Sequence, residues 1–169
     1  IGDYAFYNAS KLASITFSPD SLLTNIGENA FLDASALTSI TIPVGVTSIG
    51  EGAFYNASKL ASITFSQDSL LTNIGENAFR DASALTSIII PASVYSIGDY
   101  AFYNASKLAS ITFSQDSLLT NIGENAFRDA SSLTSIAIPA GVTNIGANAF
   151  QNASSLTSIA IPAGVTNIG

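Results

Sequence analysis

The amino-acid sequence predicts a solenoid of stacked repeats with a parallel β-sheet along one face. One motif, L-x-S-I-x followed by an apolar residue, recurs along the whole chain. Within each copy, apolar and hydroxyl residues alternate, so Ile15 and Phe17 point to one side and Ser14 and Thr16 to the other. Each copy is too short to bury its apolar side alone. The copies therefore stack, and the motif begins at Leu12, Leu37, Leu60, Leu85, Leu108, Leu133 and Leu156.

A second phrase, Ile-Gly, fixes the phase of the repeats. The interval from Ile1 to Ile26 is longer than that from Ile26 to Ile49, and long and short intervals then alternate until a final short one. We call these intervals the long step and the short step. Such a period indicates one continuous array rather than separate globular domains. We expect a single domain over residues 1–169, with turns at 1–25, 26–48, 49–73, 74–96, 97–121, 122–144 and 145–167.

Each turn is expected to contain a glycine corner, a helical turn, a strand and a return loop, in that order. Gly27 and its equivalents supply the permissive backbone of the corner. The segment 28–34 is predicted to form a helical turn with Ala30, Phe31 and Ala34 facing inward. The strands are predicted at Leu12–Phe17, Leu37–Ile42, Leu60–Phe65, Leu85–Ile90, Leu108–Phe113, Leu133–Ile138 and Leu156–Ile161.

The return loops are of two kinds, long ones such as 18–25 and short ones that begin with proline, such as 43–48. Proline has no backbone N–H and therefore ends the strand before it. Asp20, Asp68 and Asp116 recur in the long loops. One carboxylate per loop is a poor calcium site, because calcium takes six to eight oxygen ligands, so we expect these residues to shape the backbone turns.

Composition excludes several functional classes. The net charge is −7 and there is no basic run, which argues against nucleic-acid binding. The absence of Cys and His removes disulfides, thiol nucleophiles, imidazole bases and the common zinc ligands. No segment is apolar over the roughly 18 residues that a membrane span needs. We therefore expect no cofactor, no metal and no enzymatic activity.

The repeated phrases carry a family resemblance. The L-x-x-[I/L]-x-[F/I/L] pattern is similar to the strand signature of leucine-rich repeats, and I-x-x-I-G-x-x-A-F together with I-P-x-x-V-x-x-I-G resembles the BspA-like class of surface antigens. The small residue that is often Cys in this class is alanine at Ala9, Ala34 and Ala57. The resemblance implies a right-handed leucine-rich-repeat solenoid of the α/β class, rich in β-structure, with parallel strands on one face and short helical or irregular turns on the other. It also implies attachment to matrix proteins or other cells.

In leucine-rich repeats the outward strand residues form the concave face, which is the first candidate binding surface. Here that face is a ladder of hydroxyls, and it lacks the aromatic and arginine residues that dominate strong interfaces. A plain exposed sheet of high β-propensity is the alternative interpretation. The candidate residues are Ser14, Thr16, Ser39, Thr41, Ser62, Thr64, Ser110 and Thr112.

Tyrosines form a second candidate surface that repeats every second turn, with Lys11, Lys59 and Lys107 close in sequence. Tyrosine can anchor a partner, and it can equally cover apolar surface while its hydroxyl stays in water. The stripe comprises Tyr4, Tyr7, Tyr55, Tyr100 and Tyr103, and possible glycosylation sites of the Asn-Ala-Ser type follow at Asn8, Asn56, Asn104 and, in the same pattern, Asn152.

The sequence thus favours a non-enzymatic, extracellular or cell-surface module for adhesion or protein recognition, whose partner is a protein or a glycan. A rival hypothesis comes from the ends, because Ile1-Gly2 and Ile168-Gly169 share one repeat phase and no polar capping turn is present. Either the sequence is an excerpt of a longer array, or chains stack head to tail as a structural spacer or filament.

Overall fold

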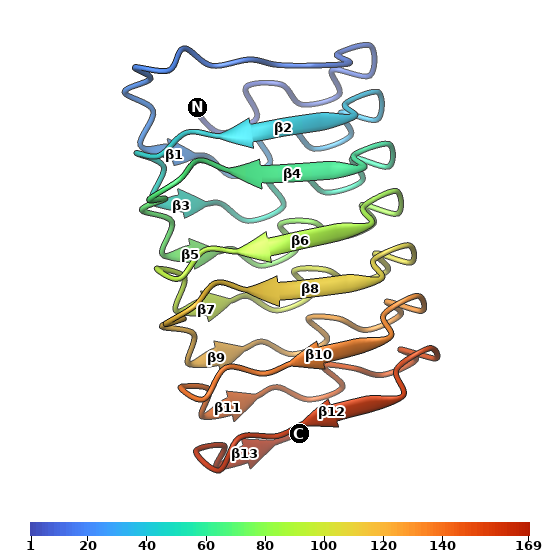
Figure 1. Cartoon of the computed structure of the whole chain (residues 1–169). Helices are drawn as coiled ribbons and strands as arrows, with labels where there is room; N and C mark the ends of the chain where they lie inside the picture. Colours follow the sequence, from blue (N-terminus) through green and yellow to red (C-terminus); the bar gives the residue numbers. More distant parts are fainter.

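The computed structural model describes all 169 residues and consists of one stack of turns carrying two parallel β-sheets (Figure 1). The larger strands form a six-stranded sheet in the order β12-β10-β8-β6-β4-β2, so every turn pairs only with its neighbours along the chain. This topology confirms the predicted parallel solenoid. The strands are β2 (Ser39–Ile42), β4 (Ser62–Phe65), β6 (Ser87–Ile90), β8 (Ser110–Phe113), β10 (Ser135–Ala137) and β12 (Ser158–Ala160).

A second sheet, of seven very short strands, was not expected from the sequence. Each strand is a polar residue followed by the isoleucine of the Ile-Gly phrase, and equivalent residues pair in register, as in Asn25 with Ser48 and Ile26 with Ile49. Such strands are too short to show an alternating pattern. They are β1 (Asn25–Ile26), β3 (Ser48–Ile49), β5 (Asn73–Ile74), β7 (Ser96–Ile97), β9 (Asn121–Ile122), β11 (Asn144–Ile145) and β13 (Asn167–Ile168).

The strands of the larger sheet differ from the predicted ones in three ways. β10 and β12 end at Ala137 and Ala160, one residue before the predicted ends. All the strands begin at the serine of the motif rather than at its leucine, and the segment Leu12–Phe17 contains only an isolated bridge from Ser14 to Ser39. The reason is the alternating repeat length. Across a short step the ladder is long, and all of β2 pairs with β4, whereas across a long step only the serines pair, as between β4 and β6. Ser14 and Ser39 are separated by a long step, so this pair of turns is also joined only through its serines.

The predicted helical turn over 28–34 is wrong, because the structure contains strands and turns but no helix. Asn29 and Asp33 have φ angles of 51° and 60°, in the left-handed region, and a right-handed helix cannot pass through them. Alternate backbone N–H groups instead bond to the next turn of the solenoid, for example Phe31 N–H to the Ala53 carbonyl at 2.7 Å. The inward placement of Ala30, Phe31 and Ala34 is confirmed, since all three are buried.

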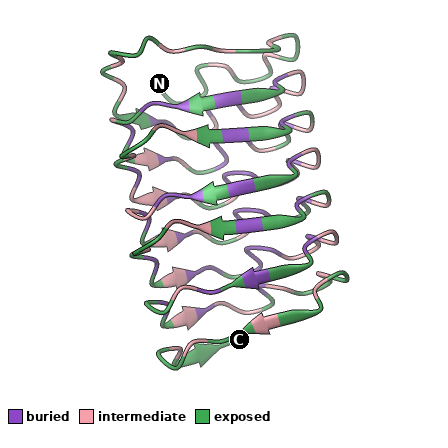
Figure 2. Cartoon of the chain, in the orientation of Figure 1, coloured by how far each residue is buried: buried purple, intermediate pink, exposed green.

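The core is a set of apolar columns that runs along the stack (Figure 2). Neighbouring rings of the phenylalanine column stack at centroid distances between 4.9 and 5.4 Å. The strands alternate exposed and buried residues, as predicted, with Ser39 and Thr41 outside and Ile40 and Ile42 inside. No helix in the structure has the length and hydropathy needed to cross a bilayer. The phenylalanine column comprises Phe6, Phe31, Phe54, Phe79, Phe102, Phe127 and Phe150.

Candidate functional site

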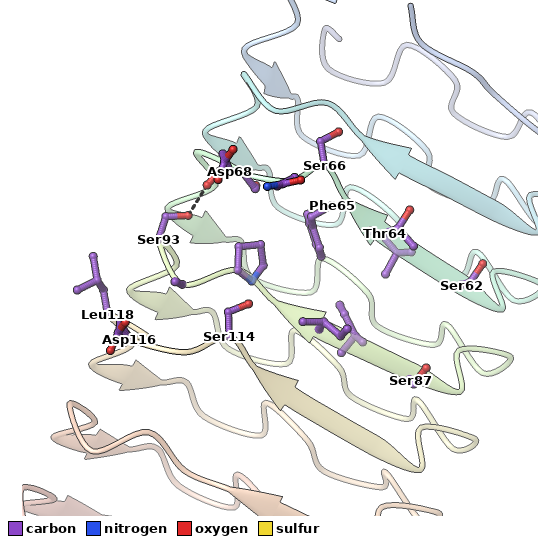
Figure 3. A pocket seen from close by; sticks show the side chains of 17 residues that line it. Ser62, Thr64, Phe65, Ser66, Asp68, Ser87, Ser93, Ser114, Asp116 and Leu118 are labelled. Atoms are coloured by element: carbon purple, nitrogen blue, oxygen red, sulfur yellow. Dashed lines mark hydrogen bonds between the residues drawn. The ribbon is translucent and has the colours of Figure 1, made fainter. Parts of the chain in front are cut away.

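The most prominent concave feature is a groove of about 830 Å³ on the outer face of the six-stranded sheet, above β4 and β6 (Figure 3). This volume is in the range of small-ligand and side-chain binding sites. The groove opens where β4 and β6 pair only through Ser62 and Ser87 and then separate. We call this feature the large groove.

The separation has a local cause in the hydrogen bonding of the long return loop. Ser66 N–H and the Ser66 hydroxyl both donate to the Ile42 carbonyl, at 3.0 and 3.1 Å, and Leu70 N–H donates to the Val44 carbonyl at 3.0 Å. The long loop is therefore hydrogen-bonded to the turn before it, and a gap remains between the loop and the turn after it. The loop at 114–118 is likewise hydrogen-bonded to the turn before it, since Leu118 N–H donates to the Ala92 carbonyl at 2.8 Å. The two long loops form the walls of the large groove, with the short return at 91–93 between them.

Two departures from the repeat coincide with the large groove. Ile89 occupies a position that is Thr41, Ala137 or Ala160 in the other short turns, and its side chain is 62% exposed. Ser93 occupies a position that is glycine in those turns. The Ser93 hydroxyl lies 2.9 Å from the Ser69 carbonyl and 2.6 Å from the Leu71 carbonyl, so it joins the short return to the base of the long loop.

The floor of the large groove is apolar and its rim is polar. Ile89 and the half-buried Phe65 supply the apolar surface of the floor, and Leu118, which is 63% exposed, belongs to the wall formed by the loop at 114–118. Serine and threonine hydroxyls surround this surface, and Asp68 and Asp116 stand on opposite walls (Figure 3). No lysine or arginine lines the groove. An apolar floor inside a rim of hydroxyls and carboxylates is suited to holding a side chain and its polar backbone.

A second groove, of about 550 Å³, lies two turns earlier, between the loops that begin at Ser18 and Ser66. It also follows a long step, so the alternating repeat length produces both grooves. Its lining includes Thr41 at the position of Ile89. That hydroxyl is 2.8 Å from the hydroxyl of Thr64, and the smaller groove thus presents a hydroxyl where the large groove presents the hydrocarbon of Ile89.

The structure places all the predicted hydroxyl-face residues outside the core, but it gathers only some of them. Ser62 and Thr64 line the large groove and Thr16 and Thr41 line the smaller one. Ser14, Ser39, Ser110 and Thr112 lie outside both grooves. The sequence-based prediction missed Ile89 and the loop residues, although the break in the threonine row at Ile89 was a visible signal.

The tyrosine stripe is organised around an arginine that the sequence analysis did not select. The Arg80 guanidinium carbon lies 4.8 Å from the centroid of the Tyr103 ring, 5.3 Å from that of Tyr55 and 5.7 Å from that of Tyr100. Tyr55, Arg80 and Tyr103 each follow a phenylalanine of the column, so in-register stacking brings them together, and this repeat phase was a signal that the sequence analysis did not use. The Arg80 side chain is 33% exposed and its Nε lies 3.6 Å from Asp81 Oδ2. Tyr4 and Tyr7 form a separate edge-to-face pair with ring centroids 6.1 Å apart.

The asparagines of the possible glycosylation sites are exposed and lie at positive φ, between 55° and 60°. In three of them the side-chain amide donates to an aspartate of the preceding turn at 2.7 Å, for example Asn56 to Asp33. These amides help to join adjacent turns. The four residues are Asn8, Asn56, Asn104 and Asn152.

The carboxylates of the long loops are arranged singly. Asp68 and Asp116 have φ angles of 58° and 57°, so they take the left-handed positions of their turns as expected, whereas Asp20, the third aspartate of that prediction, is not at positive φ. The structure contains no group of three or more Asp, Glu, His or Cys residues close enough to share a metal ion.

Solved structures similar to this chain are bacterial repeat proteins. The structure of the pneumococcal vaccine antigen PcpA is 32% identical with a TM-score of 0.77, and the match covers 90% of this chain and 39% of that one. The leucine-rich repeat protein of T. pallidum, TpLRR, is 28% identical with a TM-score of 0.79, over 92% of this chain and 70% of that one. This chain thus spans well under half the length of the PcpA structure. A comparison with curated proteins found no significant match.

The family comparison covers the entire chain. The family described as BspA type leucine rich repeat region (6 copies) matches residues 1–83 and 72–169. Leucine-rich repeats are in general a non-catalytic protein-interaction fold. The family match and the similar structures support a protein-interaction repeat module. The repeated Ile-Gly phase, the parallel solenoid and the family match agree, and the chain therefore belongs to the BspA type leucine-rich repeat family.

Proposed function

We propose that the chain is a non-enzymatic recognition module of a cell-surface or extracellular protein, and that it binds a protein partner through the large groove. The observation that carries this proposal is Ile89, a branched apolar side chain that is 62% exposed in the groove where other turns have threonine or alanine. A single exposed apolar side chain is common on protein surfaces, but apolar surface with a polar rim in a groove marks an interaction site, and Ile89 lines the same groove as Phe65. The family match and the similarity to a vaccine antigen support the surface location.

A protein partner fits the groove better than a glycan does. Sugars are commonly held by flat aromatic rings, and the one aromatic residue of the large groove, Phe65, is half-buried. The floor is instead branched aliphatic surface, which favours an aliphatic side chain of a protein. Because Ile89 is 62% exposed, burying the rest of its side chain contributes roughly 1–2 kcal/mol, which corresponds to about 5- to 30-fold in affinity.

The test is the replacement Ile89→Thr, which restores the residue found at Thr41 and leaves the hydroxyl rim unchanged. Binding of the labelled chain to intact cells and to a panel of immobilised matrix proteins would be measured against the wild type. Thr112→Ser is the matched control, because Thr112 is in the same row but outside both grooves.

We expect Ile89→Thr to weaken binding about five-fold or more and Thr112→Ser to leave it unchanged. Circular dichroism would establish that both variants keep the fold. Equal binding by Ile89→Thr and wild type would exclude the large groove as the recognition site.

A further inference from the structure

We propose that the large groove receives a single extended segment of the partner, in which an apolar side chain is flanked by lysine or arginine. This inference rests on the proposed function and adds the conformation and charge of the occupant. Three features of the groove support it: the two unengaged carboxylates on its walls, its width, and the distribution of apolar and hydroxyl groups inside it.

The carboxylates of Asp68 and Asp116 have no partner in the protein. Most other aspartates are engaged: Asp3 and Asp99 accept backbone N–H groups of the next turn, and the aspartate equivalent to Asp33 in each pair of turns accepts an asparagine amide. No hydrogen bond or ion pair reaches the side chains of Asp68 and Asp116, and both residues are exposed. Their backbone role at positive φ would be served equally by asparagine.

Two unpaired negative charges on opposite walls, with no cation lining the groove, repel an acidic occupant and attract a basic one. The net charge of −7 extends this preference to the whole molecule. A lysine or arginine beside the apolar anchor would reach either wall, since both side chains are long and flexible at the stem.

The spacing of the walls selects an extended chain rather than a helix. The long loops at 66–69 and 114–118 belong to turns that are two steps apart in the stack. Neighbouring parallel strands lie about 4.8 Å apart, so the two walls are roughly 10 Å apart between backbones. The short return at 91–93 lies midway between the walls, so an extended chain would lie on top of it, between the two loops. An α-helix with its side chains is about 10–12 Å across and does not fit.

The interior matches an extended backbone. Ile89 provides an apolar contact for one inward side chain. The hydroxyls of Ser62, Thr64 and Ser87 stand along the same groove, where they can donate to or accept from the backbone of the occupant. In an extended chain the residues on either side of an inward side chain point outward, which directs a flanking lysine towards the carboxylates at the rim.

The test uses three synthetic pentapeptides with blocked ends, Ser-Lys-Leu-Lys-Ser, Ser-Glu-Leu-Glu-Ser and Ser-Lys-Ser-Lys-Ser. Each is titrated into the ¹⁵N-labelled chain and followed by the backbone amide signals. We expect the Lys-Leu-Lys peptide to shift the signals of Ile89, Ser93 and their neighbours in the large groove. The other two peptides are expected to bind at least about five-fold more weakly, because each lacks either the charge or the apolar contact.

The protein variants are Asp116→Asn and Asp68→Asn, with Asp20→Asn as the matched control. Asp20 is the equivalent residue of a long loop and lines neither groove. We expect each groove variant to weaken the Lys-Leu-Lys peptide by up to about five-fold, the upper range for an exposed ion pair, and Asp20→Asn to have no effect. Raising the ionic strength from about 0.02 M to about 0.5 M should abolish the difference between the variants and the wild type.

Two outcomes overturn this inference: equal binding of the Lys and Glu peptides, or unchanged binding by both Asp116→Asn and Asp68→Asn. The binding assay with the protein partner distinguishes failure of the basic-segment proposal from failure of the large groove as the binding site. If the protein partner is lost with Ile89→Thr but retained with both aspartate variants, the groove is the site and the basic occupant is wrong. If Ile89→Thr binds normally, the large groove is not the site and both proposals fail.

Discussion

Replacing Phe79 by alanine tests whether the solenoid is held together by its phenylalanine column. Phe79 is fully buried, and its ring stacks on Phe54 and Phe102 with centroids 5.2 Å away on each side. Removing a buried phenylalanine ring typically costs about 3–5 kcal/mol, which includes the cavity that remains. Each stacked pair contributes about 0.5–1.5 kcal/mol beyond its area, so loss of both contacts places Phe79→Ala at the upper end of that range.

Phe150→Ala is the informative comparison within the same column. Phe150 is only half-buried and stacks on a single ring, that of Phe127, at 5.4 Å. Its replacement removes less buried area and one stacked pair, so we expect roughly half the loss found for Phe79→Ala.

The assay is urea unfolding followed by circular dichroism. With a slope of about 2 kcal/mol per molar urea, Phe79→Ala should lower the midpoint by about 2 M. Because each turn contacts only its neighbours, a central defect is also expected to broaden the transition or split it in two. Equal midpoints for Phe79→Ala and Phe150→Ala would contradict the stacked-column account, and an unchanged midpoint for Phe79→Ala would refute the burial of its ring.

Two further variants test the contacts between turns. A Cβ on Gly98 would lie 2.6 Å from the backbone N of Glu76. Gly98→Ala should therefore force neighbouring turns apart and cost about 1–3 kcal/mol in urea unfolding. Gly2→Ala, with nothing within 4 Å, should have no measurable effect. Arg80→Ala removes guanidinium contacts with three tyrosine rings and should cost about 1–2 kcal/mol in the same assay. The control is Lys59→Ala, an exposed cation of the same surface. A loss from Lys59→Ala equal to that from Arg80→Ala would show that the ring contacts add nothing.

The tyrosine surface shows how far a periodic sequence can be interpreted. The recurrence of Tyr55 and Tyr103 every second turn predicts a stripe, and the structure brings these two rings together around Arg80. Arg80 lies one repeat from each of them, in the same repeat phase, which is where a solenoid places spatial neighbours. The lysines are nearer in sequence but in another phase, and none of them lies over a tyrosine ring.

The local conformation of the segment 28–34 was predicted wrongly for a related reason. Its spacing of Ala30, Phe31 and Ala34 is compatible with one turn of helix, and those residues are indeed buried. The backbone nevertheless takes left-handed values at Asn29 and Asp33, and its alternate N–H groups bond to the next turn. Hydrogen bonds between turns satisfy this backbone, and a short helix would have left those partners in the neighbouring turn unpaired.

The sequence by itself determined the architecture, because burial in a stacked array is periodic and the apolar residues record that period directly. From Leu12 onward, the motif predicted parallel in-register stacking, an inward Ile40 and an outward Ser39, and the phenylalanine column. Only the tertiary structure decided where the alternation of long and short steps separates the strands and forms a groove. The long loops hydrogen-bond to the turn before them, so the strands separate on one side, and the gap that results places Ile89 between Asp68 and Asp116. A groove depends on where hydrogen bonds are not made between turns, and the identity of the residues alone does not specify that.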